Sequence, residues 1–160
     1  MPSTPLAILP TLEADLDRVE DELLRVVAGD GAFVTEIASH LILAGGKRVR
    51  PGFCITAASV LDHDGGPAAL DVVRGGCAVE LVHIGSLYHD DVMDDATTRR
   101  NVPSVNAQWG NLRAILAGDY LLGRSSQIAA DLGTEVAGLL AATIARLCEG
   151  QVRELQDAYN

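Results

Sequence analysis

Apolar residues recur at helical intervals through most of the chain. Between residues 12 and 27 they are separated by acidic residues and arginines, a pattern typical of an amphipathic helix with one buried face. Gly29 follows as a suitable end for this helix. The apolar positions of the buried face are Leu12, Leu16, Val19, Leu23, Val26 and Val27.

The same periodicity predicts helices over most of the remaining chain. A turn is expected at residues 62–67 and a loop at 97–104, where glycine, proline and polar residues gather. Gly75-Gly76 is a point at which the longest helix can break. No segment alternates apolar and polar residues as a strand would, so we expect one all-α helical bundle spanning residues 1–160. The expected helices cover residues 31–44, 51–61, 68–94, 104–108, 111–131 and 134–158.

The composition agrees with a helical protein and excludes some functions. Of the 160 residues, 48% are hydrophobic and only 4% are aromatic, which favours helices over strands. The formal net charge of −10 argues against a general nucleic-acid-binding protein, although clustered basic residues can still bind a phosphate locally. No stretch reaches the roughly 18 apolar residues that a membrane-spanning helix needs, so we expect no stable membrane insertion.

The cysteines and the chain ends indicate the cellular context. Cys54, Cys77 and Cys148 are far apart in apolar surroundings, so we expect reduced core residues and a cytoplasmic protein. The first ten residues have no positive charge and do not resemble a signal peptide. The last predicted helix stops without a capping residue, which leads us to expect that the polypeptide continues beyond residue 160.

Four aspartates occur within residues 90–95. Asp90 and Asp94 are one helical turn apart, so both can face one ligand, and Mg²⁺ commonly binds one or two carboxylates together with substrate phosphates. The alternative is a solvated acidic helix end, a placement that the helix dipole disfavours. Asp95 lies off the face that these carboxylates share. The residues within that arc of about 100° are Glu80, His83, Leu87, Asp90, Asp91 and Asp94.

Basic residues gather on both sides of the acidic stretch. "GGKRVRP" at residues 45–51 has three cations in four positions, including Lys47, the only lysine, and Arg99 and Arg100 follow the aspartates. Free amides at a helix start and arginine side chains both suit phosphate oxygens. The alternatives are an ordinary basic helix start and partial neutralisation of the nearby acids. Five of the twelve Lys and Arg residues lie in these two stretches, which favours a metal-bridged anion beside a second anion held by bases.

Together these stretches resemble the trans-isoprenyl (polyprenyl) diphosphate synthases. The resemblance rests on "GGKRVRP", on "ELVHIGSLYHDDVMDDATTRR" with a DDxxD motif at residues 90–94, on "PSVNAQWGNLRAILAGDYLL" and on "EGQVREL". DDxxD alone also occurs in class I terpene cyclases, so the resemblance depends on the combination. It covers most of the chain from about residue 40 and implies the N-terminal half of an isoprenoid-synthase bundle of roughly 300–350 residues.

The resemblance implies a prenyltransferase that condenses isopentenyl diphosphate with an allylic diphosphate, head to tail and in the trans configuration. Lys47, Arg50 and His83 would hold isopentenyl diphosphate, with Arg100 on the same side. The family usually forms homodimers, which we expect here on that ground alone.

The resemblance assigns the allylic diphosphate to the aspartate-rich region. Asp90 and Asp94 would bind Mg²⁺ bridging that diphosphate, with Asp91 in support, and Arg99 would contact the diphosphate directly. These four residues are the expected catalytic set. Diphosphate departure would leave an allylic cation for the isopentenyl double bond to attack, so no protein nucleophile is needed.

Three further features follow from the resemblance. Gly85 and Ser86, just before the aspartates, are small, and their size favours a medium- or long-chain product, although Tyr88 is bulkier than the usual aliphatic residue. Asn101 stands where the family usually has glycine, which would reshape that loop. The chain also stops before the family's second aspartate-rich motif, so about half of an active site is present.

Two other functions remain as alternatives. A class I terpene cyclase would use the DDxxD motif, but it takes no second substrate, and Lys47, Arg50 and His83 argue against it. A catalytically incomplete subunit or fragment that needs a partner is the second alternative. Regulatory subunits of the family often lose DDxxD, and this chain retains it.

Overall fold

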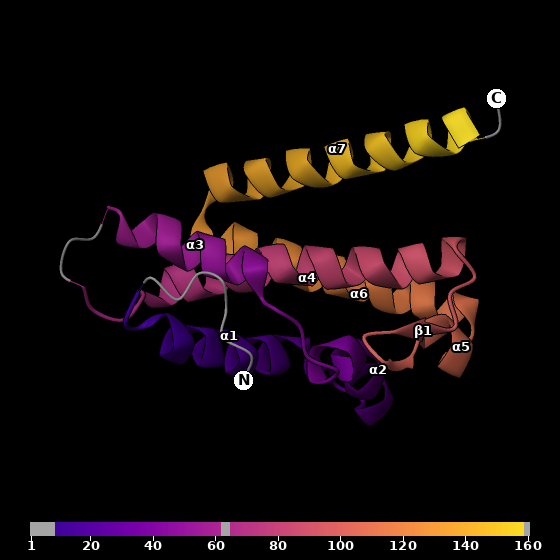
Figure 1. Ribbon diagram of the computed structural model, residues 1–160, viewed down its shortest axis with the longest axis horizontal. Coiled ribbons are helices and arrows are strands. Elements are labelled where there is room, and N and C mark those ends of the chain that lie inside the picture. The colour runs from indigo at the N-terminus through magenta and orange to yellow at the C-terminus, as the bar shows by residue number, and fades with distance from the viewer. Residues whose placement is uncertain (1–8, 62–64, 159–160) are drawn as a thin grey trace.

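The computed structural model describes residues 9–61 and 65–158. Within them the chain forms seven α-helices and one short β-hairpin (Figure 1). The turn predicted at 62–67 falls partly outside the described residues. The elements are α1 (Leu12–Val27), α2 (Ala32–Leu43), α3 (Val49–Ser59), α4 (Leu70–Met93), β1 (Thr98–Arg99), β2 (Val102–Pro103), α5 (Val105–Trp109), α6 (Asn111–Leu132) and α7 (Thr134–Ala158).

The prediction that the chain lacks strands was wrong at one place. β1 pairs with β2 in antiparallel register, with Arg99 opposite Val102. Strands of two residues are too short to produce an alternation of apolar and polar positions, so the sequence pattern shows only a polar loop there. The helices begin and end within about two residues of the expected positions, the usual uncertainty of helix boundaries.

Helix α4 is the centre of the bundle, with α1, α3 and α6 packed around it (Figure 1). One stripe of α4 consists of Val73, Cys77, Leu81, Ile84 and Tyr88, each at most 1% exposed. Their spacing of three or four residues keeps them on one side of the helix. The other sides of the same helix are therefore available to α3 and to the charged residues near its C-terminal end.

Glycines let neighbouring helices approach α4 closely. The helix runs unbroken through Gly75-Gly76, where a Cβ at Gly76 would lie only 3.3 Å from the Cα atom of Pro51 in α3. A Cβ at Gly85 would lie 3.1 Å from the carbonyl oxygen of Gly118 in α6. The break predicted at Gly75-Gly76 did not occur, because Gly76 lies where α4 packs against α3.

Helix α7 packs on α6 only through its first turns, where Leu140 is buried and Ile144 is half-buried. Leu139 and Leu147 are 71% and 53% exposed, and the distal part of α7 stands away from the bundle (Figure 1). The prediction of three core cysteines holds for buried Cys77 and in part for half-buried Cys54, and it was wrong for Cys148, which is exposed on α7. No helix of the described ranges is both long and apolar enough to cross a bilayer.

Replacing Gly85 by alanine should destabilise the fold. The new methyl group would meet the Gly118 carbonyl at 3.1 Å, and forcing extra volume into a packed contact costs about 1–3 kcal/mol. Gly123→Ala is the matched control, because a Cβ at that helical position meets nothing within 4 Å and should stabilise α6 by roughly 0.5–1 kcal/mol. Urea denaturation measures both changes, and equal effects in the two variants would contradict the packing described for α4 and α6.

Candidate active site

The aspartates of the acidic stretch lie where α4 ends. The amide of Asp94 donates to the carbonyl of Asp90 at 2.8 Å, and the amide of Ala96 donates to the carbonyl of Asp91 at 2.9 Å. Asp95, between them, has a φ of 50°, the left-handed conformation that ends many helices and that aspartate tolerates better than most residues. Asp95 therefore turns the chain out of the helix.

Asp91 lies inside the protein, with its side chain 0% exposed. Its Oδ1 atom accepts a hydrogen bond from Nε of Arg99 at 2.8 Å and is 2.5 Å from Nη2 of the same residue. The expectation that Asp91 faces the same ligand volume as Asp90 and Asp94 was therefore wrong: the helix face that they share is partly covered by the β-hairpin. This position fits the supporting role that the resemblance implied.

The β-hairpin turns at Arg100 and Asn101. Both have positive φ angles, 53° and 64°, and two such residues between paired strands form a type I′ turn. Asparagine is one of the few residues besides glycine that this turn favours. Asn101, which stands where the family usually has glycine, was expected to reshape the loop. The backbone conformation of Asn101 is, however, one that glycine also adopts.

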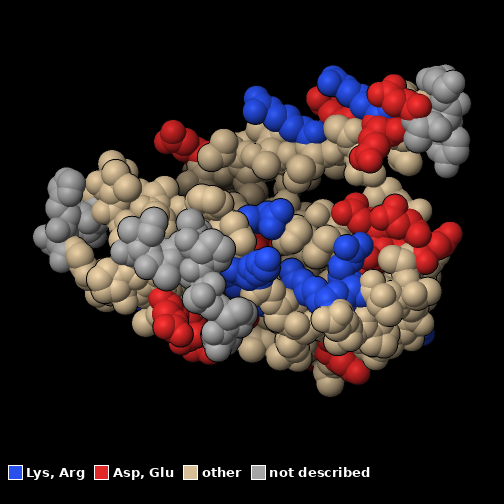
Figure 2. All heavy atoms as spheres, in the orientation of Figure 1, with Lys and Arg blue, Asp and Glu red and all other residues tan. Residues whose placement is uncertain are grey.

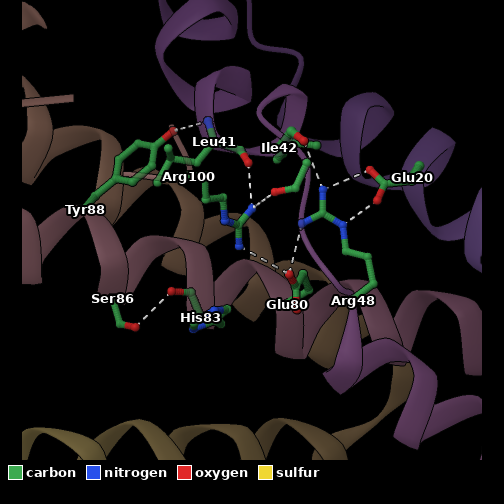
Figure 3. Close-up of polar contacts among 10 residues, drawn as sticks. Glu20, Leu41, Ile42, Arg48, Glu80, His83, Ser86, Tyr88 and Arg100 are labelled. Atoms are coloured by element: carbon green, nitrogen blue, oxygen red, sulfur yellow. Dashed lines mark hydrogen bonds and ion pairs between the residues drawn. The ribbon is translucent and has the colours of Figure 1, made fainter. Parts of the chain in front are cut away.

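Arg48, the middle cation of the "GGKRVRP" stretch, is only 4% exposed. Its guanidinium donates to Oε2 of Glu20 at 3.0 Å, to the carbonyl of Ile42 at 3.0 Å and to Oε1 of Glu80 at 3.1 Å (Figure 3). It therefore joins α1, the end of α2 and the middle of α4. With its donors used inside the protein, Arg48 has a structural function.

Arg100 reaches the same region from the hairpin. Its Nη1 atom donates to the carbonyls of Leu41, at 2.7 Å, and Gly45, and its Nη2 atom lies 3.9 Å from Oε1 of Glu80 (Figure 3). A Cβ at Gly46 would lie 3.0–3.1 Å from atoms of both guanidinium groups. Gly46, the second glycine of "GGKRVRP", thus leaves room for two arginine side chains beneath the loop.

Lys47 and Arg50 are exposed beside the buried Arg48, and His83 is half-buried one turn beyond Glu80 on α4. Burial and, after it, the charges of nearby arginines, Arg50 first among them, together lower the pKa of His83 to about 4. The imidazole is therefore neutral near pH 7, although cations surround it. An anion bound among these cations would favour the protonated form.

Asp90 and Asp94 are the carboxylates at the end of α4 that were predicted to hold a cation. Asp90 is half-buried and Asp94 is exposed; burial raises the pKa of Asp90, and the charge of Asp94 raises it further. A divalent cation would relieve this repulsion. No group of three or more potential metal ligands gathers in the described part of the chain. Two carboxylates one turn apart would leave most ligands of a cation to water or phosphate.

The three charged stretches meet along one side of α4. Glu80 contacts the arginines of both basic stretches, and three turns later Asp91 holds Arg99. Figure 2 shows basic side chains gathered at the centre of this face, with acidic side chains beside them near the end of α4. Segments as far apart in sequence as residues 47 and 99 therefore form one candidate site.

The residues considered for product length lie in different surroundings. Gly85 faces α6, where it allows close packing with Gly118, and Tyr88 is buried with its hydroxyl donating to the carbonyl of Ile37 at 2.7 Å. The argument from the small size of Gly85 was therefore wrong, and the bulk of Tyr88 lies in the core. Ser86 is half-buried, and its hydroxyl donates to the His83 carbonyl at 2.9 Å (Figure 3).

Sequence reasoning missed the functions of Arg48, Glu80 and Asn106. Glu80 was placed on the shared helix arc without a partner, and Arg48 was counted as one cation of a cluster. Asn106 donates to the carbonyls of Asp91 at 3.1 Å and Ala96 at 3.0 Å, which fastens α5 to the end of α4. A glutamate inside an otherwise apolar helical stretch was the one signal that could have indicated a buried ion pair.

Comparison with known proteins agrees with this geometry. The sequence model of the family described as "Polyprenyl synthetase" matches residues 32–160. The chain belongs to this family. That finding confirms the predicted family and the helical isoprenoid-synthase fold, since solved polyprenyl synthases share the arrangement of helices described above.

Curated members of the polyprenyl synthetase family align with nearly the whole chain. A nonaprenyl diphosphate synthase of Mycobacterium tuberculosis is 43% identical over 89% of this chain and 42% of its own length. The heptaprenyl diphosphate synthase component 2 of Geobacillus stearothermophilus is 41% identical over 96% of this chain and 47% of its own length. The chain thus spans less than half the length of these relatives.

Solved structures give the same result. A decaprenyl diphosphate synthase from Rhodobacter capsulatus superposes with a TM-score of 0.82 at 35% identity, covering 91% of this chain and 44% of that protein. A polyprenyl synthase from Caulobacter crescentus, solved in complex with calcium and isoprenyl diphosphate, gives a TM-score of 0.82 at 31% identity, covering 89% and 43%. The chain has the fold of the corresponding part of these synthases.

The lowered pKa of His83 predicts a pH dependence of stability. Because its pKa is about 4 in the folded chain and 6.5 ordinarily, the unfolded state binds this proton more readily. The contribution of neutral His83 to the free energy of unfolding is complete above about pH 6.5 and is lost as the pH falls towards 4. His83→Gln should therefore lose stability less steeply over that range in urea denaturation, and an NMR titration of the imidazole that gave a pKa near 6.5 would contradict the burial described here.

Proposed function

We propose that this chain forms the isopentenyl- and allylic-diphosphate-binding half of a trans-polyprenyl diphosphate synthase. The observation that supports this most is the meeting of both basic stretches on α4 beside Asp90 and Asp94. The arginine neighbours of Lys47 and Arg99 contact the same carboxylate, Glu80, which brings the two expected diphosphate-binding segments to one helix.

Isopentenyl diphosphate is assigned to the basic loop before α3. Lys47 and Arg50 are exposed and able to reach its phosphate oxygens, and neutral His83 can donate a hydrogen bond from α4. Arg100 uses Nη1 for two backbone carbonyls, so its contribution to this diphosphate would come from the rest of its guanidinium. A bound diphosphate would favour the protonated imidazole, which likewise donates a hydrogen bond.

The allylic diphosphate is assigned to the end of α4. Asp90 and Asp94 would hold Mg²⁺, which when bound stabilises negative charge on the departing diphosphate. Arg99 is fixed by Asp91 through its Nε and Nη2 atoms, so the guanidinium is already oriented when substrate arrives. Preorganised charge of this kind stabilises the transition state without reorganisation during the reaction.

The proposed reaction breaks the C–O bond between the allylic carbon and its diphosphate. The isopentenyl double bond then forms the new C–C bond, and the adduct loses a proton to give the longer allylic diphosphate. The basic residues hold both diphosphates throughout, which keeps the reacting carbons close together. The names of several relatives, such as the nonaprenyl and heptaprenyl synthases, support a medium- or long-chain product.

A second candidate is a subunit or fragment that becomes active only with a partner. The relatives are more than twice as long as the aligned region, and most of α7 exposes apolar residues such as Leu139, Leu147 and Val152. One relative is named as a second component of its synthase. The homodimer that the resemblance implied and an assembly with a different chain both remain proposals.

The test of the proposed function is condensation by the full-length protein. It is incubated with labelled isopentenyl diphosphate, farnesyl diphosphate and Mg²⁺, and butanol-extractable label is counted and sized by chromatography. Labelled product that also requires farnesyl diphosphate supports the synthase, whereas unlabelled product formed from farnesyl diphosphate alone and detected by chromatography would favour a terpene cyclase. If no label is extracted, the proposal fails.

Replacing Asp90 by alanine should abolish condensation, with a loss of at least about a hundredfold in kcat/KM. The substitution removes a proposed ligand of the Mg²⁺ that stabilises the departing diphosphate. Asp95→Asn is the control: it removes one charge of the same cluster but keeps a residue that tolerates the left-handed φ of 50°. Steady-state kinetics should show at most a modest change in the control. Similar losses in both variants would mean that the cluster acts only through its total charge.

A further inference from the structure

Glu80 is a buried carboxylate between two arginines. Its side chain is 2% exposed, and Oε1 faces Nη1 of Arg48 at 3.1 Å and Nη2 of Arg100 at 3.9 Å. Oε2 is buried without a hydrogen-bond partner among the residues that the structure describes. Burying a carboxylate is unfavourable unless cations compensate it, so Glu80 and the two guanidinium groups depend on each other.

Both arginines have strained backbones. Arg48 and Arg100 have φ angles of 45° and 53°, in the left-handed region that residues with a Cβ atom avoid. Such a conformation persists only where surrounding contacts hold it. Carbonyls at and just after the end of α2 and the carboxylate of Glu80 hold both side chains, and Glu20 also pairs with Arg48, as Figure 3 shows.

The residues proposed to touch diphosphate adjoin this cluster in the sequence. Lys47 precedes Arg48, and Arg99 precedes Arg100. A change in the backbone of Arg48 or Arg100 therefore moves the cation beside it, exposed Lys47 in one case and half-buried Arg99 in the other. We propose that Glu80 is a positioning residue: by holding Arg48 and Arg100, it fixes the cations on both diphosphate-binding segments. This inference rests on the proposed function of the site.

Electrostatics alone makes the opposite prediction, which gives the proposal a clear test. Glu80 is an anion near a site for anions, so neutralising it would strengthen diphosphate binding if its charge were all that mattered. If Glu80 positions the cations, neutralising it weakens binding. The sign of the change in affinity therefore distinguishes the two accounts.

The experiment is calorimetric titration of the chain with inorganic pyrophosphate and Mg²⁺. We expect Glu80→Gln to raise the dissociation constant by about tenfold or more at unchanged stoichiometry, since misplaced contacts weaken each site. A mere loss of folded protein would lower the stoichiometry and leave the affinity unchanged. Glu22→Gln is the control, because Glu22 pairs with Arg25 and Arg74 away from this cluster, and it should bind as the unaltered chain does.

A second variant reaches the same arginines without altering charge. Gly46→Ala places a methyl group 3.0–3.1 Å from atoms of both guanidinium groups and should also raise the dissociation constant. If Glu80→Gln fails to fold, Gly46→Ala serves as the test of whether the placement of the two arginines controls diphosphate binding. Pyrophosphate binding that is unchanged or tighter in the folded variants overturns the positioning role. Failure of the unaltered chain to bind pyrophosphate instead overturns the proposed function itself.

Discussion

Buried carboxylates on α4 require cations, and this requirement organises the candidate site. Glu80 and Asp91 are 2% and 0% exposed. Glu80 lies against arginines from two different segments, and Asp91 pairs with Arg99 of the β-hairpin. Because an unpaired buried charge is strongly unfavourable, the loop before α3 and the β-hairpin must return to α4 for the chain to fold. The exposed cations on the same segments are thereby brought beside Asp90 and Asp94.

Much of this arrangement could be predicted from the sequence. Apolar spacing gave the helices correctly, because one face of each is buried in the usual way, as Val19 and Leu23 show in α1. The motifs identified the family and the segments that bear charge. The synthase fold is confirmed by the family match and by solved relatives, whereas the function of each site residue stays a prediction.

The surroundings of the individual side chains depend on contacts between different elements, which spacing along one helix does not reveal. The helical arc placed Asp91 and Asp90 together, but the hairpin covers Asp91 and leaves Asp90 half-buried. The small size of Gly85 suggested a medium- or long-chain product, whereas this glycine packs against the backbone of Gly118. In each case an element absent from the local pattern decides what a side chain faces.

The reciprocal effect of Mg²⁺ and pyrophosphate on each other's binding tests the central claim most directly. Two carboxylates beside a cluster of bases should bind the metal weakly alone and tightly with a diphosphate, because the anion supplies the remaining ligands. By linkage, the factor by which pyrophosphate strengthens Mg²⁺ binding must equal the factor by which Mg²⁺ strengthens pyrophosphate binding. Calorimetric titrations in both orders should give the same factor, of about tenfold or more. If neither Mg²⁺ nor pyrophosphate changed the affinity of the protein for the other, a metal-bridged diphosphate at the end of α4 would be contradicted.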